Sequence, residues 1–320
     1  MALSFSNLSV ENKPIVMAAL FIPIILTVGT IYTLSQNGTM PLLTPTYLML
    51  QLQTGAFLGI AAAGMMMVIL LGHIDLSIPW TMTAAAMMAT TVGGDLAIPT
   101  GLAVGLAIGL FNGFGVAFLR IPSMIFTLGV DSVMRGLMVA HTGGFSPTTE
   151  ATPLMKTLGS GKIFGVFPVA ILVWAGISVL IGLILKRTGF GRSVYAVGNS
   201  EGAAFLSGIR TRRVLIGSFV MSGLCSASAG MLLAGYSSKA FQGMGNEYLL
   251  PAIAAVVIGD THILGGRGRY IGTLIGVILL VLLQSVLSIM QMPEAGRQVI
   301  YGAFIIGMLL FYGRNTKITS

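Results

Sequence analysis

The chain has 320 residues, of which 55% are hydrophobic and only 8% are charged, and its formal net charge at pH 7 is +8. Soluble domains carry about 25% charged residues, so this composition excludes a soluble protein and predicts a chain that faces lipid over most of its surface. No polar stretch is long enough for a separate soluble domain. We therefore expect residues 1–320 to form a single membrane-spanning domain.

Apolar runs of about 20 residues recur along the chain, which is typical of an all-α polytopic membrane protein. The first run is longer than the apolar region of a cleaved signal peptide, about 7–15 residues, and we expect it to remain as a helix. Short or interrupted helices are expected near residues 72–80 and 248–262. The ten predicted spans cover residues 15–36, 47–71, 78–95, 97–119, 122–141, 166–185, 214–236, 248–261, 270–290 and 298–312.

The basic residues predict the orientation of these spans. Cytoplasmic loops carry an excess of Lys and Arg, and an inside amino terminus with ten spans places most of them on one side. Both termini, the loop 186–213 and the larger basic set would then be cytoplasmic, with the loop 142–165 as an external cap. That larger set is Lys13, Arg120, Lys186, Arg187, Arg192, Arg210, Arg212, Arg213, Arg267, Arg269, Arg314 and Lys317, and the opposite side holds Lys156, Lys162, Lys239 and Arg297.

Two short segments resemble each other and indicate a weak internal repeat. Residues 69–75 and 257–263 each follow one apolar run and precede another. Both copies would enter the membrane in the same direction, so the repeat is predicted to be parallel, with an axis along the membrane normal. Chance similarity between apolar segments is the alternative.

Five polar residues within or beside the spans are candidates for a translocation path or gate. Asp131 and Arg135 are four residues apart on one helix face, so they can pair. Pairing would offset the cost of an isolated charge in hydrocarbon, which is at least about 2.5 kcal/mol. The pair either fixes the helix or lines a wet path. Asp75 and Ser77 are expected to cap the next span or to form a gate, and the two roles are compatible. Asn112 either bonds between helices or lines the path.

The loop 186–213 predicts a short helix over residues 201–209. Asn199 or Ser200 would be its N-cap, with an acidic residue in the first turn and Gly208 at the end. The alternative is an amphipathic segment on the lipid surface, although its apolar face is small for strong membrane binding. That face is expected to contain Ala204, Leu206 and Phe205.

Nothing in the chain indicates catalysis. A Walker A sequence is absent, because the glycine-rich run 265–269 lacks the Lys-Ser/Thr ending. No nucleophile–base pair or paired carboxylates stand out. His73, His141, His262 and Cys225 have no metal-ligand spacing. We expect no catalytic residue, no metal and no cofactor bound by this chain.

Four segments together resemble the permease subunit of ribose/xylose/arabinose/galactose-type sugar ABC importers, and they extend over nearly the whole chain. The segments are Gly72-His73-Ile74-Asp75-Leu76-Ser77; Asn112-Gly113 with Ile121-Pro122, Thr127-Leu128-Gly129 and Arg135-Gly136; residues 189–209; and Gly265-Gly266-Arg267-Gly268 with Ile271-Gly272-Thr273. The chain departs from the family pattern at His73, at Pro79-Trp80, at Asp131, and at Gly202 and Phe205.

This resemblance implies a permease that works as a dimer, with a second copy or a sibling. A separate ATPase pair would use ATP on the inside and a solute-binding protein would deliver solute outside. The segment 186–213 would couple the ATPase to the permease. The residues that the resemblance assigns to this coupling are Gly191, Arg192, Glu201, Ala203, Ala204, Leu206, Ser207 and Gly208.

The expected function is therefore import of a monosaccharide or related small polyol across the bacterial inner membrane. A furanone-type signal or a nucleoside is an alternative solute. A stand-alone secondary transporter and a membrane-embedded enzyme are alternatives of other classes. Proton coupling normally needs a relay of intramembrane Asp, Glu or His residues, and only Asp131 is well placed for one.

Overall fold

The computed structural model describes residues 13–38 and 40–313. Arg314 and Lys317, which contribute to the predicted charge asymmetry, lie outside the described residues. The elements are α1 (Lys13–Asn37), η3 (Pro41–Leu43), α2 (Pro45–Ile69), α3 (Ile78–Val92), η4 (Gly94–Leu96), α4 (Ala97–Leu119), α5 (Ser123–Thr142), α6 (Pro153–Ser160), β1 (Lys162–Ile163), β2 (Phe167–Pro168), α7 (Val169–Arg187), α8 (Gly189–Asn199), α9 (Glu201–Leu206), α10 (Thr211–Tyr236), η5 (Asn246–Tyr248), α11 (Leu249–Ile258), α12 (Tyr270–Ile289) and α13 (Glu294–Gly313).

A helix lies at each of the ten predicted spans, and the all-α polytopic class is confirmed. Among the described residues, seven helices are long and apolar enough to cross a membrane, namely α1, α2, α4 with the preceding turn, α5, α7, α10 and α12. As predicted, α3 and α11 are short, with 15 and 10 residues. A total of ten spans stays a prediction.

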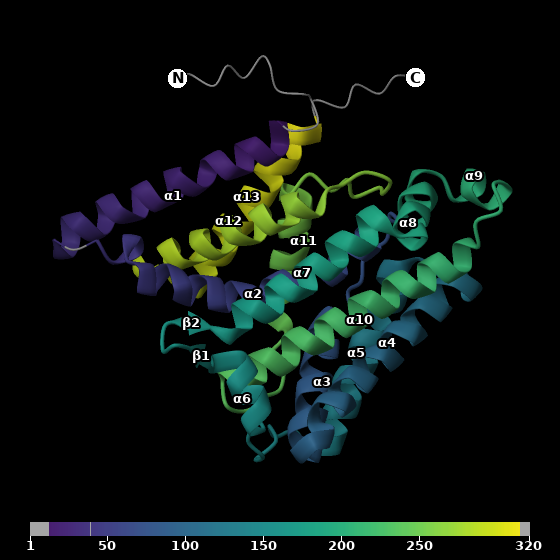
Figure 1. Ribbon diagram of the computed structural model, residues 1–320, viewed down its shortest axis with the longest axis horizontal. Helices are drawn as coiled ribbons and strands as arrows, with labels where there is room; N and C mark the ends of the chain where they lie inside the picture. The colour runs from purple at the N-terminus through teal and green to yellow at the C-terminus, as the bar shows by residue number, and fades with distance from the viewer. Residues whose placement is uncertain (1–12, 39, 314–320) are drawn as a thin grey trace.

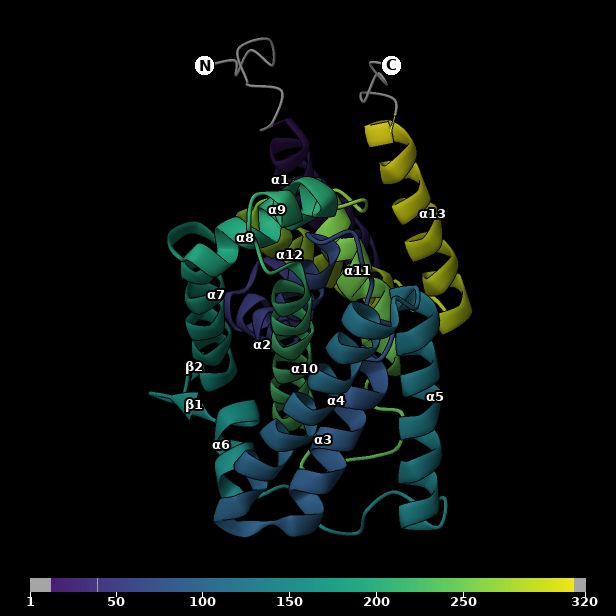
Figure 2. The same cartoon turned by 90° about the vertical axis from the view of Figure 1, so that its right-hand side faces the viewer.

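The helices form two groups that meet at α2 (Figure 1). On one side α10 packs against α3 and α4, and α5 packs against those two helices. On the other side α12 packs against α1 and α11. Figure 2 shows α8 and α9 at one end of the bundle, where α7 ends and α10 begins, and α6 with the β1–β2 hairpin at the opposite end. The expected external cap 142–165 therefore contains ordered structure.

The contact between α4 and α10 is built on a stripe of glycines, and the small residues let the two backbones approach closely. Four glycines of α4 recur at every fourth position and face α10, and Gly223 of α10 faces back. A Cβ atom added at Gly105 would lie 2.4 Å from the carbonyl oxygen of Gly223. The stripe consists of Gly101, Gly105, Gly109 and Gly113.

The two short predicted repeat segments end their helices in the same way. Gly72 after α2 and Asp260 after α11 are equivalent positions in the predicted repeat, and both have a left-handed φ, 76° and 69°. In both turns the amide of this residue donates to the carbonyl three residues back, and the next amide donates to the carbonyl five residues back. The two breaks also touch, because the Gly266 amide donates to the Leu70 carbonyl at 2.9 Å. The direction of the whole repeat stays a prediction.

Candidate functional site

The predicted coupling segment forms two short helices, α8 and α9, at one end of the bundle (Figure 2). In α8 the side chain of Thr188 caps the first turn by accepting from the Gly191 amide at 3.1 Å. Gly191 packs against the last turn of α7, where an added Cβ would lie 2.3 Å from the Ile184 carbonyl oxygen. Arg192 is exposed. Gly191 thus serves a close helix–helix approach, and Arg192 is free to meet a partner.

Both predicted ends of α9 are confirmed. Of the two predicted N-caps the structure uses Ser200, whose Oγ accepts from the Ala203 amide at 3.3 Å. At the other end Gly208 has a φ of 82°. Its amide donates to the Phe205 carbonyl and the Ile209 amide donates to the Ala204 carbonyl. This pair of bonds is a Schellman ending, which favours glycine at the left-handed position.

The outer surface of α9 is apolar. The side chains of Phe205 and Leu206 are 68% and 87% exposed, whereas Ala204 is buried against the bundle. The predicted single apolar face of these three residues is therefore wrong for Ala204, which lies on the side of α9 that faces the bundle, whereas Phe205 and Leu206 lie on the outward side. Three other predicted coupling residues of this segment are also exposed, namely Ala203, Ser207 and Gly208.

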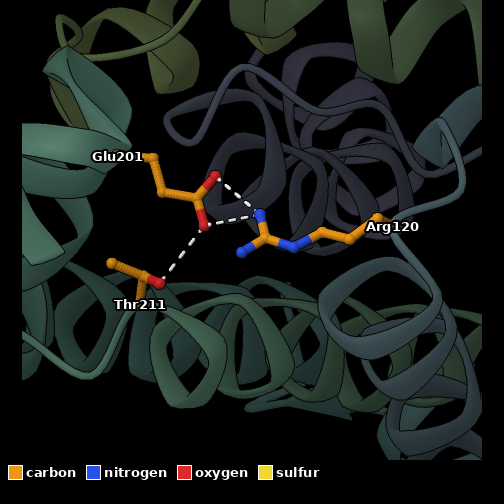
Figure 3. Close-up of polar contacts among 3 residues, drawn as sticks. All are labelled: Arg120, Glu201 and Thr211. Atoms are coloured by element: carbon orange, nitrogen blue, oxygen red, sulfur yellow. Dashed lines mark hydrogen bonds and ion pairs between the residues drawn. The ribbon is translucent and has the colours of Figure 1, made fainter.

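Glu201, also predicted to couple, points toward its own chain (Figure 3). Nη1 of Arg120 donates to both carboxylate oxygens of Glu201, at 2.9 and 3.1 Å. Thr211 Oγ1 donates to Oε1 at 3.2 Å. Arg120 follows the last residue of α4 and Thr211 begins α10. From its position in the sequence Arg120 is only a predicted cytoplasmic charge, and nothing local marks a partner 81 residues away.

The break between α2 and α3 holds a buried polar cluster. Asp75 Oδ1 accepts from the amide and the hydroxyl of Ser77, at 3.0 and 2.6 Å, and Oδ2 accepts from Ser222 of α10 at 2.7 Å. Asn112 of α4 donates from Nδ2 to the Ser77 hydroxyl at 2.7 Å. All four side chains are buried. The interhelical bond predicted for Asn112 is confirmed, and Ser222 was missed.

The predicted capping of α3 by Asp75 or Ser77 is wrong. Ser77 occupies the N-cap position, but its side chain makes no capping bond, because its hydroxyl is engaged by Asp75 and Asn112. The cap comes instead from α5, since Asp131 Oδ1 accepts from the Trp80 amide at 3.2 Å. Free amides at a helix start attract a carboxylate.

The predicted ion pair between Asp131 and Arg135 is also wrong. Asp131 and Arg135 do not come within the 4.0 Å of an ion pair, a distance that Arg120–Glu201 and Lys156–Glu150 do meet. Asp131 is half-buried against the start of α3, and Arg135 is exposed on α5. The four-residue spacing permits the pair, but the unpaired amide of Trp80 lies within reach and takes the carboxylate. Arg135 therefore presents a charge on the surface of a membrane-spanning helix.

Comparison with known proteins places this arrangement in a family. Residues 47–309 match the family described as branched-chain amino acid transport system / permease component. The chain is 37% identical to the autoinducer 2 import system permease protein of Yersinia enterocolitica over 262 residues, which is 79% of this chain and 71% of that protein. It is 35% identical to the ribose import permease protein of Haemophilus influenzae over 243 residues, 73% of this chain and 75% of that protein.

The corresponding autoinducer 2 import permease of Yersinia pseudotuberculosis is 35% identical over 264 residues, 79% of this chain and 73% of that protein. No solved structure is significantly similar. The relatives are transport permeases rather than enzymes, and the lipid-compatible helices of this chain agree with a multi-pass membrane subunit. The chain belongs to the family of ABC import-system permease components, as its sequence had led us to expect.

Proposed function

We propose that this chain is the membrane-spanning permease subunit of an ATP-binding cassette importer that moves a monosaccharide or a related small solute across the inner membrane. The observation that carries the proposal is the capped helix α9, which exposes Phe205 and Leu206 beside α8 at one end of a bundle of apolar helices. Exposed apolar residues at the end of a lipid-facing bundle suit a protein partner. Relatives that import ribose and autoinducer 2 support the solute class.

The partners follow from the family. We infer a dimer of permease subunits, an ATPase pair that docks on the segment 186–213, and a solute-binding protein on the opposite face. In this arrangement both termini and α9 are cytoplasmic, and ATP is used only by the ATPase. The basic residues near α8 and α9 support this orientation, because cytoplasmic segments carry excess positive charge. A stand-alone secondary transporter is disfavoured, since the relatives are named as parts of import systems.

The five candidate path residues take different roles in this proposal. Asp75, Ser77 and Asn112 bond to one another inside the protein, so we assign them to the gate formed by the break between α2 and α3. Asp131 and Arg135 remain candidates for the path. Arg135 facing lipid would cost about 2.5–3.5 kcal/mol on insertion scales. A water-filled path or the second subunit on that side of α5 avoids this cost.

The proposal is tested by purifying the chain from its native membrane in mild detergent and identifying its partners by mass spectrometry. We expect a stoichiometric partner that carries a Walker A sequence. Reconstituted with that partner and a solute-binding protein, the complex should take up ribose or autoinducer 2 only with ATP. A chain that purifies alone and moves solute in liposomes without ATP would refute the importer and favour a secondary transporter.

A further inference from the structure

We propose that Arg120, Glu201 and Thr211 form a clasp that fixes α9 to the adjoining ends of α4 and α10, so that a push on α9 moves these two helices together. The inference rests on the proposed function, because it concerns how a docked ATPase moves the permease. It changes the role of Glu201 from a residue that meets the ATPase to a positioning residue that holds the coupling helix.

The geometry leaves the Glu201 carboxylate engaged by its own chain. Both of its oxygens accept from the same guanidinium nitrogen of Arg120, and one of them also accepts from Thr211 (Figure 3). The three side chains come from three separate elements, so the clasp joins α9 to two helices at once. An ATPase that bound this carboxylate directly would compete with those bonds.

Apart from the clasp, α9 packs against its chain neighbours α8 and α10. The helix has six residues, far below the length at which an isolated helix is stable in water. Phe205 and Leu206 face outward, and Ala204 is its buried side chain. Its two ends are fixed by local caps, which set its shape but not its position on the bundle. The clasp adds a polar side-chain link from α9 to the end of α4 and the start of α10.

Beyond the clasp, α4 and α10 are built to move as a unit. Backbone atoms of the two helices meet along the glycine stripe, where Gly105 faces Gly223. A second link lies beside the clasp, since the Arg212 guanidinium of α10 sits 4.9 Å from the ring centre of Phe118 on α4. Displacing the end of α4 thus displaces α10 with it.

The same pair of helices reaches the buried gate. Asn112 of α4 lies eight residues before Arg120, about 12 Å along the helix, and donates to Ser77. Ser222 of α10 donates to Asp75. A displacement that enters at α9 therefore has a continuous path of named contacts to the break between α2 and α3.

Charge exchange tests the clasp in the full importer reconstituted in lipid nanodiscs. The variants are Arg120→Glu, Glu201→Arg and the double exchange, and Glu201→Gln keeps the side-chain shape while removing the charge. Spin labels at Ala203→Cys on α9 and Leu106→Cys on α4, both exposed, report the distance between these helices in the permease alone, and transport is measured in the importer with unlabelled variants that keep Ala203 and Leu106. Cys225, the single native cysteine, is replaced by Ser. Lys162→Glu, a charge reversal at the opposite end of the bundle, is the control.

We expect each single exchange to broaden the distance distribution and to lower the solute moved per ATP by about tenfold, a typical coupling effect. The double exchange should restore both, and Lys162→Glu should keep the wild-type distance distribution. High salt should broaden the wild-type distribution, because the Arg120 and Glu201 side chains are 57% and 38% exposed and their attraction is screened.

Two results would overturn the clasp. One is a normal distance distribution and normal transport in Arg120→Glu. The other is a loss of coupled transport in both Glu201→Arg and Glu201→Gln, together with a double exchange that does not restore transport. That result would assign Glu201 to direct contact with the ATPase. The distance measurement also works on the permease alone. Failure of the wild-type chain to bind any ATPase would refute the proposed function while leaving the clasp measurable.

Discussion

Substituting Ala for Gly105 should separate the two helices that form the centre of the bundle. The added Cβ would lie 2.4 Å from the Gly223 carbonyl oxygen and 2.5 Å from the Ala227 Cβ. Ordinary contact begins near 3.4 Å, so α4 and α10 must move apart by about 1 Å. A gap of that size forfeits about a quarter to a half of the dispersion energy of each affected contact.

Overpacking of this kind costs about 1–3 kcal/mol in the free energy of unfolding. The matched control is Gly182→Ala in the middle of α7, where an added Cβ meets no atom within 4 Å. That substitution should be neutral or stabilising by up to about 1 kcal/mol, because Ala is the better helix former. The two variants should therefore differ by about 1–4 kcal/mol in the free energy of unfolding.

The assay is reversible unfolding in mixed detergent micelles with increasing denaturing detergent, followed by circular dichroism. Gly105→Ala should unfold at a lower denaturant fraction than the wild type, and Gly182→Ala at the same or a higher one. Equal unfolding midpoints for the two variants would refute the argument that the glycine stripe sets the distance between α4 and α10.

Three other predictions address the gate, the docking surface and the hairpin. Asp75→Asn should lower the free energy of unfolding by about 1–3 kcal/mol, because the NH₂ group of Asn would then face either the Ser77 amide and hydroxyl or the Ser222 hydroxyl, which donate to the carboxylate in the wild type. The same unfolding titration measures this loss, and wild-type stability of the variant would contradict the prediction. Leu206→Asp should abolish copurification of the ATPase without lowering stability, since this side chain is 87% exposed, and an unchanged ATPase yield would exclude α9 as the docking site. Phe164→Asn should stabilise the permease by up to about 1 kcal/mol in a thermal melt, because Phe164 is 98% exposed with a φ of 52°, a conformation that Asn tolerates better; an unchanged or lower melting temperature would contradict it.

Features that depend on neighbours in sequence could be predicted. The N-cap Ser200 and the terminal glycine of α9 follow from local hydrogen bonding and from the left-handed backbone that glycine tolerates. The short helices around the two breaks follow from the length of their apolar runs. The equivalence of residues 69–75 and 257–263 extends to their helix-ending hydrogen bonds.

Features that depend on partners distant in the sequence could not be predicted from it. The spacing of Asp131 and Arg135 obeys the rule for helix pairs, yet Asp131 binds the amide of Trp80, 51 residues earlier in the chain. That amide is available because α2 and α3 are separate helices and the hydroxyl of Ser77 is already engaged. The local rule failed because the tertiary break left a backbone N–H donor within reach of the carboxylate, and no sequence window contains both groups.

The buried gate and the coupling helix share the same two supports, and this restricts how the permease can respond to a partner. Asn112 and Ser222 reach the break between α2 and α3 from α4 and α10, the two helices that the clasp joins to α9. Because the glycine stripe keeps these helices in backbone contact, their bonds to Ser77 and Asp75 are displaced together or not at all. Either the break follows α4 and α10, or both bonds are lost and a buried carboxylate loses a partner. The cost of that loss, about 1–3 kcal/mol or more for a charged group, favours a break that moves with the helices.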